Sequence, residues 1–411
     1  MSTPSAIQPF EDFRDSLSSA KYPEVRERLA LKPDDEAFDE MREFLLTRYE
    51  GVDVRHSFLE SGGEVVDCIP AEQQLSLRDG SEVPEPPSEP PLPDTMEAGD
   101  SPGATNHLPP QLHPRYYDPL GNQMWCPLGT VPVLRHTLDR LATDHPTLDE
   151  LLRGPRADTR RWAAGRQEIE NLGGASNINI WTPQLIPPSL LSSASQQWYS
   201  NAGLPFVPYQ TVECGWRAGI IDGAPGQTDS LPRLFVFYTR DDYKKGNSCY
   251  NDYCQGGFAY HPGANHVLHG ALSPTSQQGG TQYDIRMGFT LTGGRWWFHI
   301  AGAWIGSYPA SLFSNGTLGT SARTASFGGE TTAGFGVFPT MGSGRFPTEG
   351  FGKAAYQRTI AVNDMTGVAR HAQLTAGQVS PACYNSVITN NSSTEWGSYL
   401  YFGGPGGLNC P

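Results

Sequence analysis

The chain has 411 residues, of which only 18% are charged, and its formal net charge is −14 at pH 7. This acidic balance argues against nucleic acid and anionic membrane surfaces as partners. The 46 glycines, 35 prolines and 11% aromatic residues are typical of a turn-rich, mainly β protein, and the length suits two domains.

No apolar run is long enough to span a membrane. Residues 1–15 lack the basic and apolar regions of a secretory signal. The seven cysteines nevertheless favour an oxidising compartment. We therefore expect an extracellular protein whose export signal is not visible in this sequence.

The first 152 residues are predicted to form a smaller α+β domain. Helical periodicity covers residues 23–49, interrupted at Pro33, and residues 133–152, interrupted at Pro146. Residues 78–112 are rich in proline and acidic residues, so we expect a disordered excursion there. Residues 153–174 begin with a basic, polar stretch, which predicts an exposed junction and processing segment between domains.

The pattern changes in the second domain, residues 175–411. Short alternating runs bounded by Gly, Pro, Asn or Asp predict strands at 234–239, 283–291, 296–303 and 353–362. Thr292-Gly293-Gly294 is a hairpin signal between two of these runs. Many short antiparallel strands predict a two-sheet β-sandwich.

Two glutamates, Glu213 and Glu330, lie in strand-like segments of apolar, aromatic and glycine residues. Carboxylates brought close together cannot both ionise cheaply, so one serves as a base and the other as an acid. A solvated outward position is the ordinary interpretation of either residue alone. As a pair they are candidates for general acid–base catalysis of amide hydrolysis. Such a dyad needs one proton between two carboxylates, and ordinary surroundings place that state at acid pH, so we expect activity to be confined to acid pH.

Other chemistries have weaker signals. Ser343 lacks the Gly-x-Ser-x-Gly spacing of a nucleophile elbow, and Cys214 lacks a nearby histidine base. His266 and His269 lack the glutamate of the helical zinc-protease motif. Zinc at Cys249 and Cys254 would need a second ligand pair at suitable spacing. We predict no metal and no cofactor.

The order of motifs resembles that of the neprosin family of glutamic peptidases. The resemblance is strong over about residues 165–411 and includes these segments: Glu213-Cys214-Gly215-Trp216, Arg233 to Thr239, Asp241-Asp242-Tyr243, Trp296-Trp297, Ile305-Gly306-Ser307-Tyr308-Pro309, Gly328-Gly329-Glu330, Met341 to Gly344, Glu349 to Ala354 and Tyr401 to Gly406. Asp67-Cys68 and Cys126 to Pro132 resemble pieces of the family's activation domain.

The resemblance implies a proenzyme whose N-terminal domain inhibits it and whose peptidase domain cleaves after proline. It assigns Glu330 as the base that activates water and Glu213 as the acid. It also implies the disulfides Cys68–Cys126, Cys249–Cys254 and Cys383–Cys410, with Cys214 free. Departures from the family pattern include Cys214, Tyr238 and Ser307-Tyr308.

A cleft that selects proline needs a flat apolar wall, because the ring presents CH faces and no N–H. Trp216, three residues after Glu213, is the candidate for this wall, followed by Tyr238. The expected partners are proline-containing peptides and proteins, and we expect a monomer. The alternatives are a broad-specificity acid peptidase and a non-enzymatic sandwich that binds peptide or glycan. Sequons for glycosylation occur at Asn315, Asn390 and Asn391.

Overall fold

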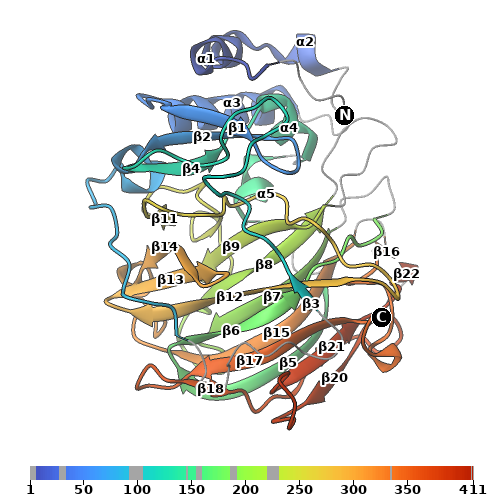
Figure 1. Cartoon of the computed structure of the whole chain (residues 1–411). Coiled ribbons are helices and arrows are strands. Elements are labelled where there is room, and N and C mark those ends of the chain that lie inside the picture. The colour runs from blue at the N-terminus through green and yellow to red at the C-terminus, as the bar shows by residue number, and fades with distance from the viewer. Residues whose placement is uncertain are drawn as a thin grey trace.

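The computed structural model has a small helical and β unit stacked on a large two-layer β structure (Figure 1). The structure describes residues 6–26, 34–91, 105–144, 147–153, 160–185, 192–219, 231–333, 336–408 and 410. Within this part of the chain, no helix is long and apolar enough to cross a membrane.

The N-terminal unit packs helices against a three-stranded antiparallel sheet of order β1-β2-β4. Its longest helix, α3, begins after Asp34, whose side chain accepts a hydrogen bond from the Ala37 amide at 2.8 Å and so caps the helix. The elements are α1 (Phe10–Ser19), α2 (Tyr22–Val25), α3 (Asp35–Tyr49), β1 (His56–Leu59), β2 (Val65–Pro70), β4 (Thr130–Leu134), α4 (Leu138–Asp144) and α5 (Leu148–Arg153).

Two expectations for this unit need correction. The helix predicted over 133–152 begins too early, because Val133 and Leu134 complete β4, where they pair with β2. In the predicted excursion, residues 92–104 lie outside the described residues. Immediately after them, β3 (Thr105–His107) pairs in parallel with β12 (Gln282–Thr292), so the end of that stretch is anchored on the sandwich.

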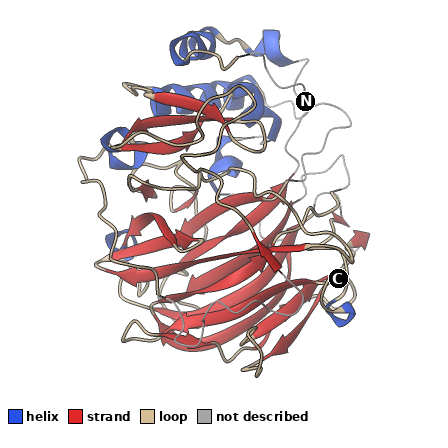
Figure 2. Cartoon of the chain, in the orientation of Figure 1, coloured by secondary structure: helices blue, strands red, loops and turns tan. Residues whose placement is uncertain are grey.

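The second unit is mainly antiparallel and forms two layers, as predicted (Figure 2). We call the layer with the two glutamates the glutamate sheet. Its order is β10 (Ser248–Tyr250), β9 (Arg233–Thr239), β8 (Thr211–Gly219), β7 (Ser192–Ser200), β15 (Ala322–Thr332), β5 (Arg160–Asn171) and β19 (Thr375–Val379).

The other layer is the back sheet. Its order is β11 (Ala259–Tyr260), β14 (Ala303–Pro309), β13 (Arg295–Ile300), β12, β6 (Gly173–Asn179), β17 (Ala355–Asn363), β21 (Tyr399–Gly403) and β20 (Asn385–Thr389), with β18 (Ala369–His371) beside β17. A separate pair joins β16 (Val337–Phe338) to β22 (Gly407–Leu408). The hairpin predicted at Gly293-Gly294 connects β12 to β13, and both glycines have positive φ.

The predicted junction at 153–174 is wrong over most of its length. Residues 160–171 form β5, which pairs with β15 on one side and β19 on the other. Gly173 and Gly174 begin β6, in the middle of the back sheet. A polar, basic segment therefore belongs to the sandwich, because cross-strand pairing satisfies its backbone groups. Of the segment, residues 154–159 lie outside the described residues.

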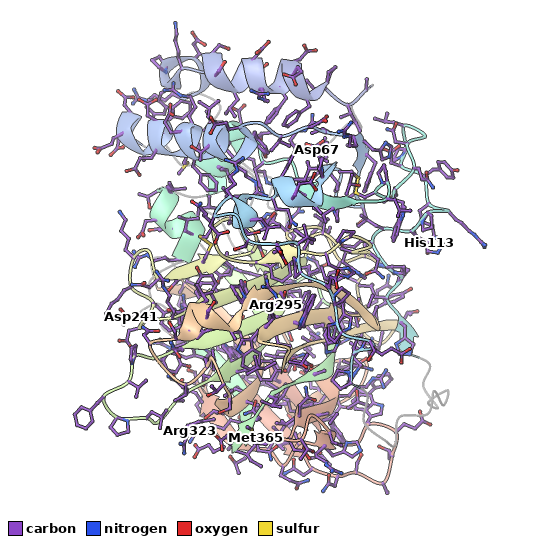
Figure 3. All side chains as sticks on the ribbon, turned by 90° about the vertical axis from the view of Figure 1, so that its left-hand side faces the viewer. Asp67, His113, Asp241, Arg295, Arg323 and Met365 are labelled. Carbon is purple, nitrogen blue, oxygen red and sulfur yellow. A yellow bond between two sulfur atoms is a disulfide. The ribbon has the colours of Figure 1, made fainter. Side chains whose placement is uncertain are left out.

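Three disulfides join Cys68 to Cys126, Cys249 to Cys254 and Cys383 to Cys410. This is the pairing that the resemblance implies. Figure 3 shows a disulfide near Asp67 in the N-terminal unit, where Cys68 follows in β2. The disulfide between Cys68 and Cys126 closes the long loop between these two residues. This loop contains residues 92–104, which lie outside the described part of the chain.

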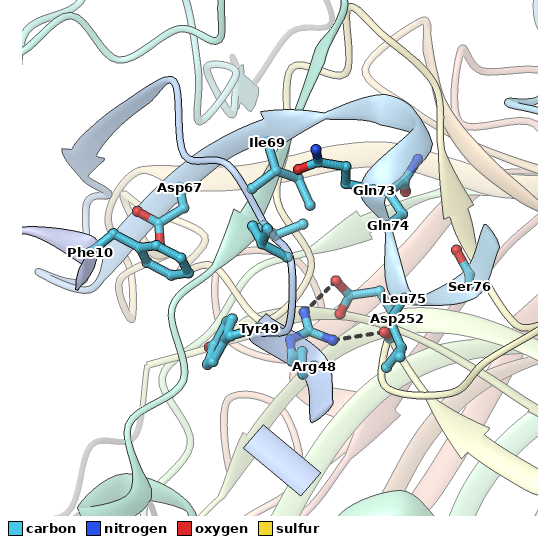
Figure 4. A pocket seen from close by; sticks show the side chains of 12 residues that line it. Phe10, Arg48, Tyr49, Asp67, Ile69, Gln73, Gln74, Leu75, Ser76 and Asp252 are labelled. Carbon is cyan, nitrogen blue, oxygen red and sulfur yellow. Dashed lines mark hydrogen bonds and ion pairs between the residues drawn. The ribbon is translucent and has the colours of Figure 1, made fainter. Parts of the chain in front are cut away.

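Buried polar contacts attach the N-terminal unit to the sandwich. Arg48 on α3 pairs with Asp252, after β10, at 2.6 Å, and their side chains are only 5% and 10% exposed (Figure 4). Glu64 pairs with Arg233 at the start of β9. The Glu60 carboxylate accepts a hydrogen bond from the Ala271 amide at 2.9 Å. Buried charges of this kind are favourable only while both partners stay ionised.

Candidate active site

Glu213 and Glu330 lie on the same face of the glutamate sheet and flank the same strand, β7. Glu213 on β8 pairs with Trp198, and Glu330 on β15 pairs with Ala194, four positions away along β7. Since side chains alternate between the two faces of a strand, this even spacing puts both carboxylates on one face. We call it the glutamate face; it points away from the back sheet.

Gln196 occupies the position of β7 between these two pairs. It lies opposite Gly215 on β8 and Gly328 on β15, and its amide nitrogen is 3.3 Å from Glu330 Oε2. A Cβ on Gly215 or Gly328 would come within 2.1 or 2.2 Å of a carbonyl oxygen, so the backbone requires glycine at both. The amide of Gln196 is therefore flanked by two positions without side chains.

Glu330 is held by donors from β5. The Trp162 indole N–H donates to Oε2 at 2.9 Å, and the Arg160 guanidinium lies 3.5 Å from Oε1. The Glu330 side chain is 13% exposed, whereas Glu213 is 4% exposed as a residue. The carboxylate of Glu330 thus lies beside one cation and two N–H donors. This environment suits a general base.

Glu213 is more deeply buried than Glu330. Thr211 donates to its Oε1 at 2.7 Å and Tyr243 donates to the same atom at 3.3 Å. Burial, followed by the charge of Glu330, raises the pKa of Glu213 to about 8, although both hydroxyls and Arg160 oppose the shift. The protonated form of Glu213 is therefore favoured at neutral pH, as a general acid requires.

Four residues of this site were not among the predicted site residues: Gln196, Trp162, Arg160 and Tyr243, although Tyr243 lies in a segment that carries the family resemblance. They come from three segments that are distant from each other in the chain, so only the folded structure reveals their contacts with the glutamates. The contact of Thr211, in contrast, could be predicted from the sequence. Thr211 lies two residues before Glu213, and side chains two positions apart on a strand share a face.

The assignment of Trp216 and Tyr238 to the substrate cleft is wrong. Trp216 is three residues from Glu213 and Tyr238 follows Phe237, the cross-strand partner of Glu213, so both point to the opposite face. Trp216 is fully buried between the sheets and donates its indole N–H to the Asn179 carbonyl at 2.9 Å. Tyr238 packs edge-on against Tyr308 in the same core.

We expect Trp216→Ala to destabilise the fold by about 3–5 kcal/mol, because it leaves a cavity in a close-packed interior. Chemical denaturation followed by circular dichroism would measure the change. Phe206→Ala is the matched control, since Phe206 is fully exposed and its loss should cost less than about 0.5 kcal/mol. Equal stability of the two variants would contradict the core position of Trp216.

The other candidate nucleophiles and ligands lie elsewhere. Cys214 is buried on the core face, where burial, followed by the charge of Glu213, raises the pKa of its thiol. Such a thiol resists forming the thiolate that nucleophilic catalysis needs. Cys249 and Cys254 are joined in a disulfide and offer no thiolate to a metal. Ser343 lies in a turn, as its glycine neighbours predicted.

A family model described as Neprosin matches residues 191–405, just over half of the chain, and the match includes both glutamates. The chain belongs to the neprosin family. Membership of this family supports a peptidase, which agrees with the activity that the sequence resemblance implies.

The neprosin-family chain also has similarity to solved structures. One is SCP-B, a member of the eqolisin family of peptidases, in complex with the tripeptide Ala-Ile-His; identity is 9%, coverage is 59% of this chain and 97% of that chain, and the TM-score is 0.31. Another is scytalido-glutamic peptidase with a peptide-based transition state analogue, at 10% identity, the same coverages and a TM-score of 0.32. At these scores the alignments assign no residue of the site.

Proposed function

We propose that this chain is the proenzyme of a glutamic endopeptidase that cleaves after proline. Glu330, ionised, removes a proton from water, which attacks the scissile carbonyl. Glu213, protonated, polarises that carbonyl and passes its proton to the leaving amine. The observation that carries the proposal is the placement of two glutamates on one sheet face, Glu330 beside the Arg160 guanidinium and Glu213 buried with a raised pKa.

Gln196 fits a supporting role in this chemistry. Its amide lies in the row between the two glutamates and contacts Glu330. An amide N–H donor on the same face is suited to stabilise the oxyanion that forms when water attacks the carbonyl. The glycines opposite it on either side add no side chain beside this amide.

The preference for proline is proposed to come from aromatic side chains of the glutamate face. Trp198 and Phe237 are the cross-strand neighbours of Glu213 on its two sides. Tyr243 stacks on Phe237 with ring centroids 6.0 Å apart, and Tyr250 contacts Phe237 at 4.5 Å. Flat apolar rings suit the CH faces of proline, so these residues replace Trp216 and Tyr238 as the proposed wall.

Latency is proposed to come from the N-terminal unit. Arg153, the last described residue of α5, donates to the Tyr243 carbonyl at 3.2 Å, and the Tyr243 hydroxyl donates to Glu213. The inhibitory unit thus reaches a direct neighbour of the proposed acid. At low pH, protonation of acidic side chains would weaken ion pairs between the two units, such as Arg48–Asp252 and Glu64–Arg233, and with them the attachment.

We expect acid processing to cut within residues 154–159. This window is what remains of the predicted segment 153–174, because a cut within β5 or β6 would divide a strand paired on both sides. Incubation at about pH 4 followed by N-terminal sequencing would locate the cut. A full-length chain that stays uncut and is fully active would contradict the proenzyme proposal.

A peptide library digested at acid pH and read by mass spectrometry tests the function itself. Cleavage confined to bonds after proline supports the proposal. Cleavage at many residues would contradict the proline preference and support a broad-specificity acid peptidase. Binding without turnover would contradict the peptidase activity and support a non-enzymatic binding module. The same preparation, analysed by gel filtration, tests the expected monomer. Secretion is part of the proposal because disulfides form in oxidising compartments.

A further inference from the structure

Arg160 is the first residue of β5 and follows directly on the proposed processing window. It pairs with Thr332 at the end of the ladder with β15, so its side chain shares the glutamate face with Glu330 and Trp162. The side chain is only 10% exposed. A guanidinium that is buried to this extent needs charged partners to offset the loss of hydration.

The guanidinium lies between the surroundings of the two glutamates. Its Nη1 is 3.5 Å from Glu330 Oε1, and its central carbon lies 5.6 Å from the centre of the Tyr243 ring. The hydroxyl of that ring donates to Glu213 at 3.3 Å. Arg160 therefore contacts one glutamate directly and the other through an aromatic side chain.

The charges around Arg160 are consistent with this position. Its titratable neighbours are Glu330 on β15, Glu213 on β8, Tyr243 after β9 and Tyr250 on β10. Burial disfavours its charged form, but the negative field of Glu330 and these other groups outweighs burial and raises the pKa of Arg160. The described residues of β19, on the other side of β5, include no titratable side chain.

We propose that Arg160 is a positioning residue of the peptidase that holds the Glu330 carboxylate in place to take a proton from water. This inference rests on the proposed function. The cation stabilises the carboxylate of Glu330, and its stack on Tyr243 keeps the guanidinium in place. A cut before Arg160 leaves the residue in the mature enzyme, next to its new N-terminus.

The test compares pH profiles of kcat/KM for acid-processed wild type, Arg160→Gln and Arg160→Lys. Arg160→Gln removes the cation beside the Glu330 carboxylate, so the acid limb of its profile should move up by about one pH unit. At the pH of the wild-type acid limb, kcat/KM of Arg160→Gln should therefore be about tenfold lower than that of wild type. Arg160→Lys retains the charge and should keep the wild-type limb.

Arg161→Gln is the matched control. Arg161 points to the opposite face, where it lies over Phe338 and donates to the Cys410 carbonyl at 2.9 Å, so its loss should leave the pH profile unchanged. Thermal melts of all variants separate a loss of folding from a change in profile.

Two outcomes would overturn the inference. One is an Arg160→Gln profile that superimposes on wild type. The other is an uncut Arg160→Gln chain that is already active. That result would mean that Arg160 keeps the proenzyme inactive instead of positioning Glu330. A processed wild type without activity at any pH would instead overturn the proposed function, together with the inference that rests on it.

Discussion

Glu213→Gln and Glu330→Gln should each lower kcat/KM by more than about a hundredfold and leave the fold intact, because a positioned acid or base contributes at least this much. Glutamine preserves the shape of glutamate and can still bond to Thr211 or Trp162, but it neither takes a proton from water nor releases one to an amine. Steady-state assays on a peptide that contains proline would measure the loss.

Glu168→Gln is the control for this pair of variants. Glu168 lies on β5 in the same sheet, but its side chain is 64% exposed and pairs with Arg166. Its replacement should leave turnover unchanged. If either Glu213→Gln or Glu330→Gln kept near wild-type turnover, that residue would be removed from the mechanism.

The pH dependence of turnover should follow the proton on Glu213. The acid must be protonated to act, and in the folded chain burial, followed by the charge of Glu330, raises its pKa to about 8. The active form therefore persists through neutrality and is lost as the pH passes about 8. The sequence alone predicts activity confined to acid pH, because it does not reveal how deeply Glu213 is buried.

The proton bound by Glu213 should also make the stability of the fold depend on pH. A group whose pKa is raised by folding contributes stability that is complete below its unfolded value and is lost as pH rises through its folded value. For Glu213 this window runs from about 4.3, the usual pKa of a glutamate, to about 8. The melting temperature of wild type should fall across it relative to Glu213→Gln.

Profiles of kcat/KM from pH 3 to 9, recorded after acid processing, would check the upper limit of activity. Loss of activity well below neutrality would show that the processed enzyme gives Glu213 a more solvated environment than this chain does. An optimum that is insensitive to both glutamate substitutions would count against the whole acid–base scheme.

Local patterns were enough to predict several strands of the sandwich. Short runs of strand-forming residues bounded by turn residues predicted β9, β12 and β17 to within a few residues. The Gly293-Gly294 turn was found for the same kind of reason, since its positive φ values favour glycine locally. The two glutamates were singled out by their apolar surroundings together with the resemblance of those segments to the neprosin family.

The sequence alone singled out the two glutamates proposed to carry the chemistry, but only the tertiary structure decided which residues lie beside them. Trp216 was placed beside Glu213 because it is close in sequence, although an odd spacing on a strand points it into the core. Gln196 and Arg160 reach the glutamates only through the pairing of β7 and β5 with β15. Such register depends on contacts between distant segments, which no local pattern contains.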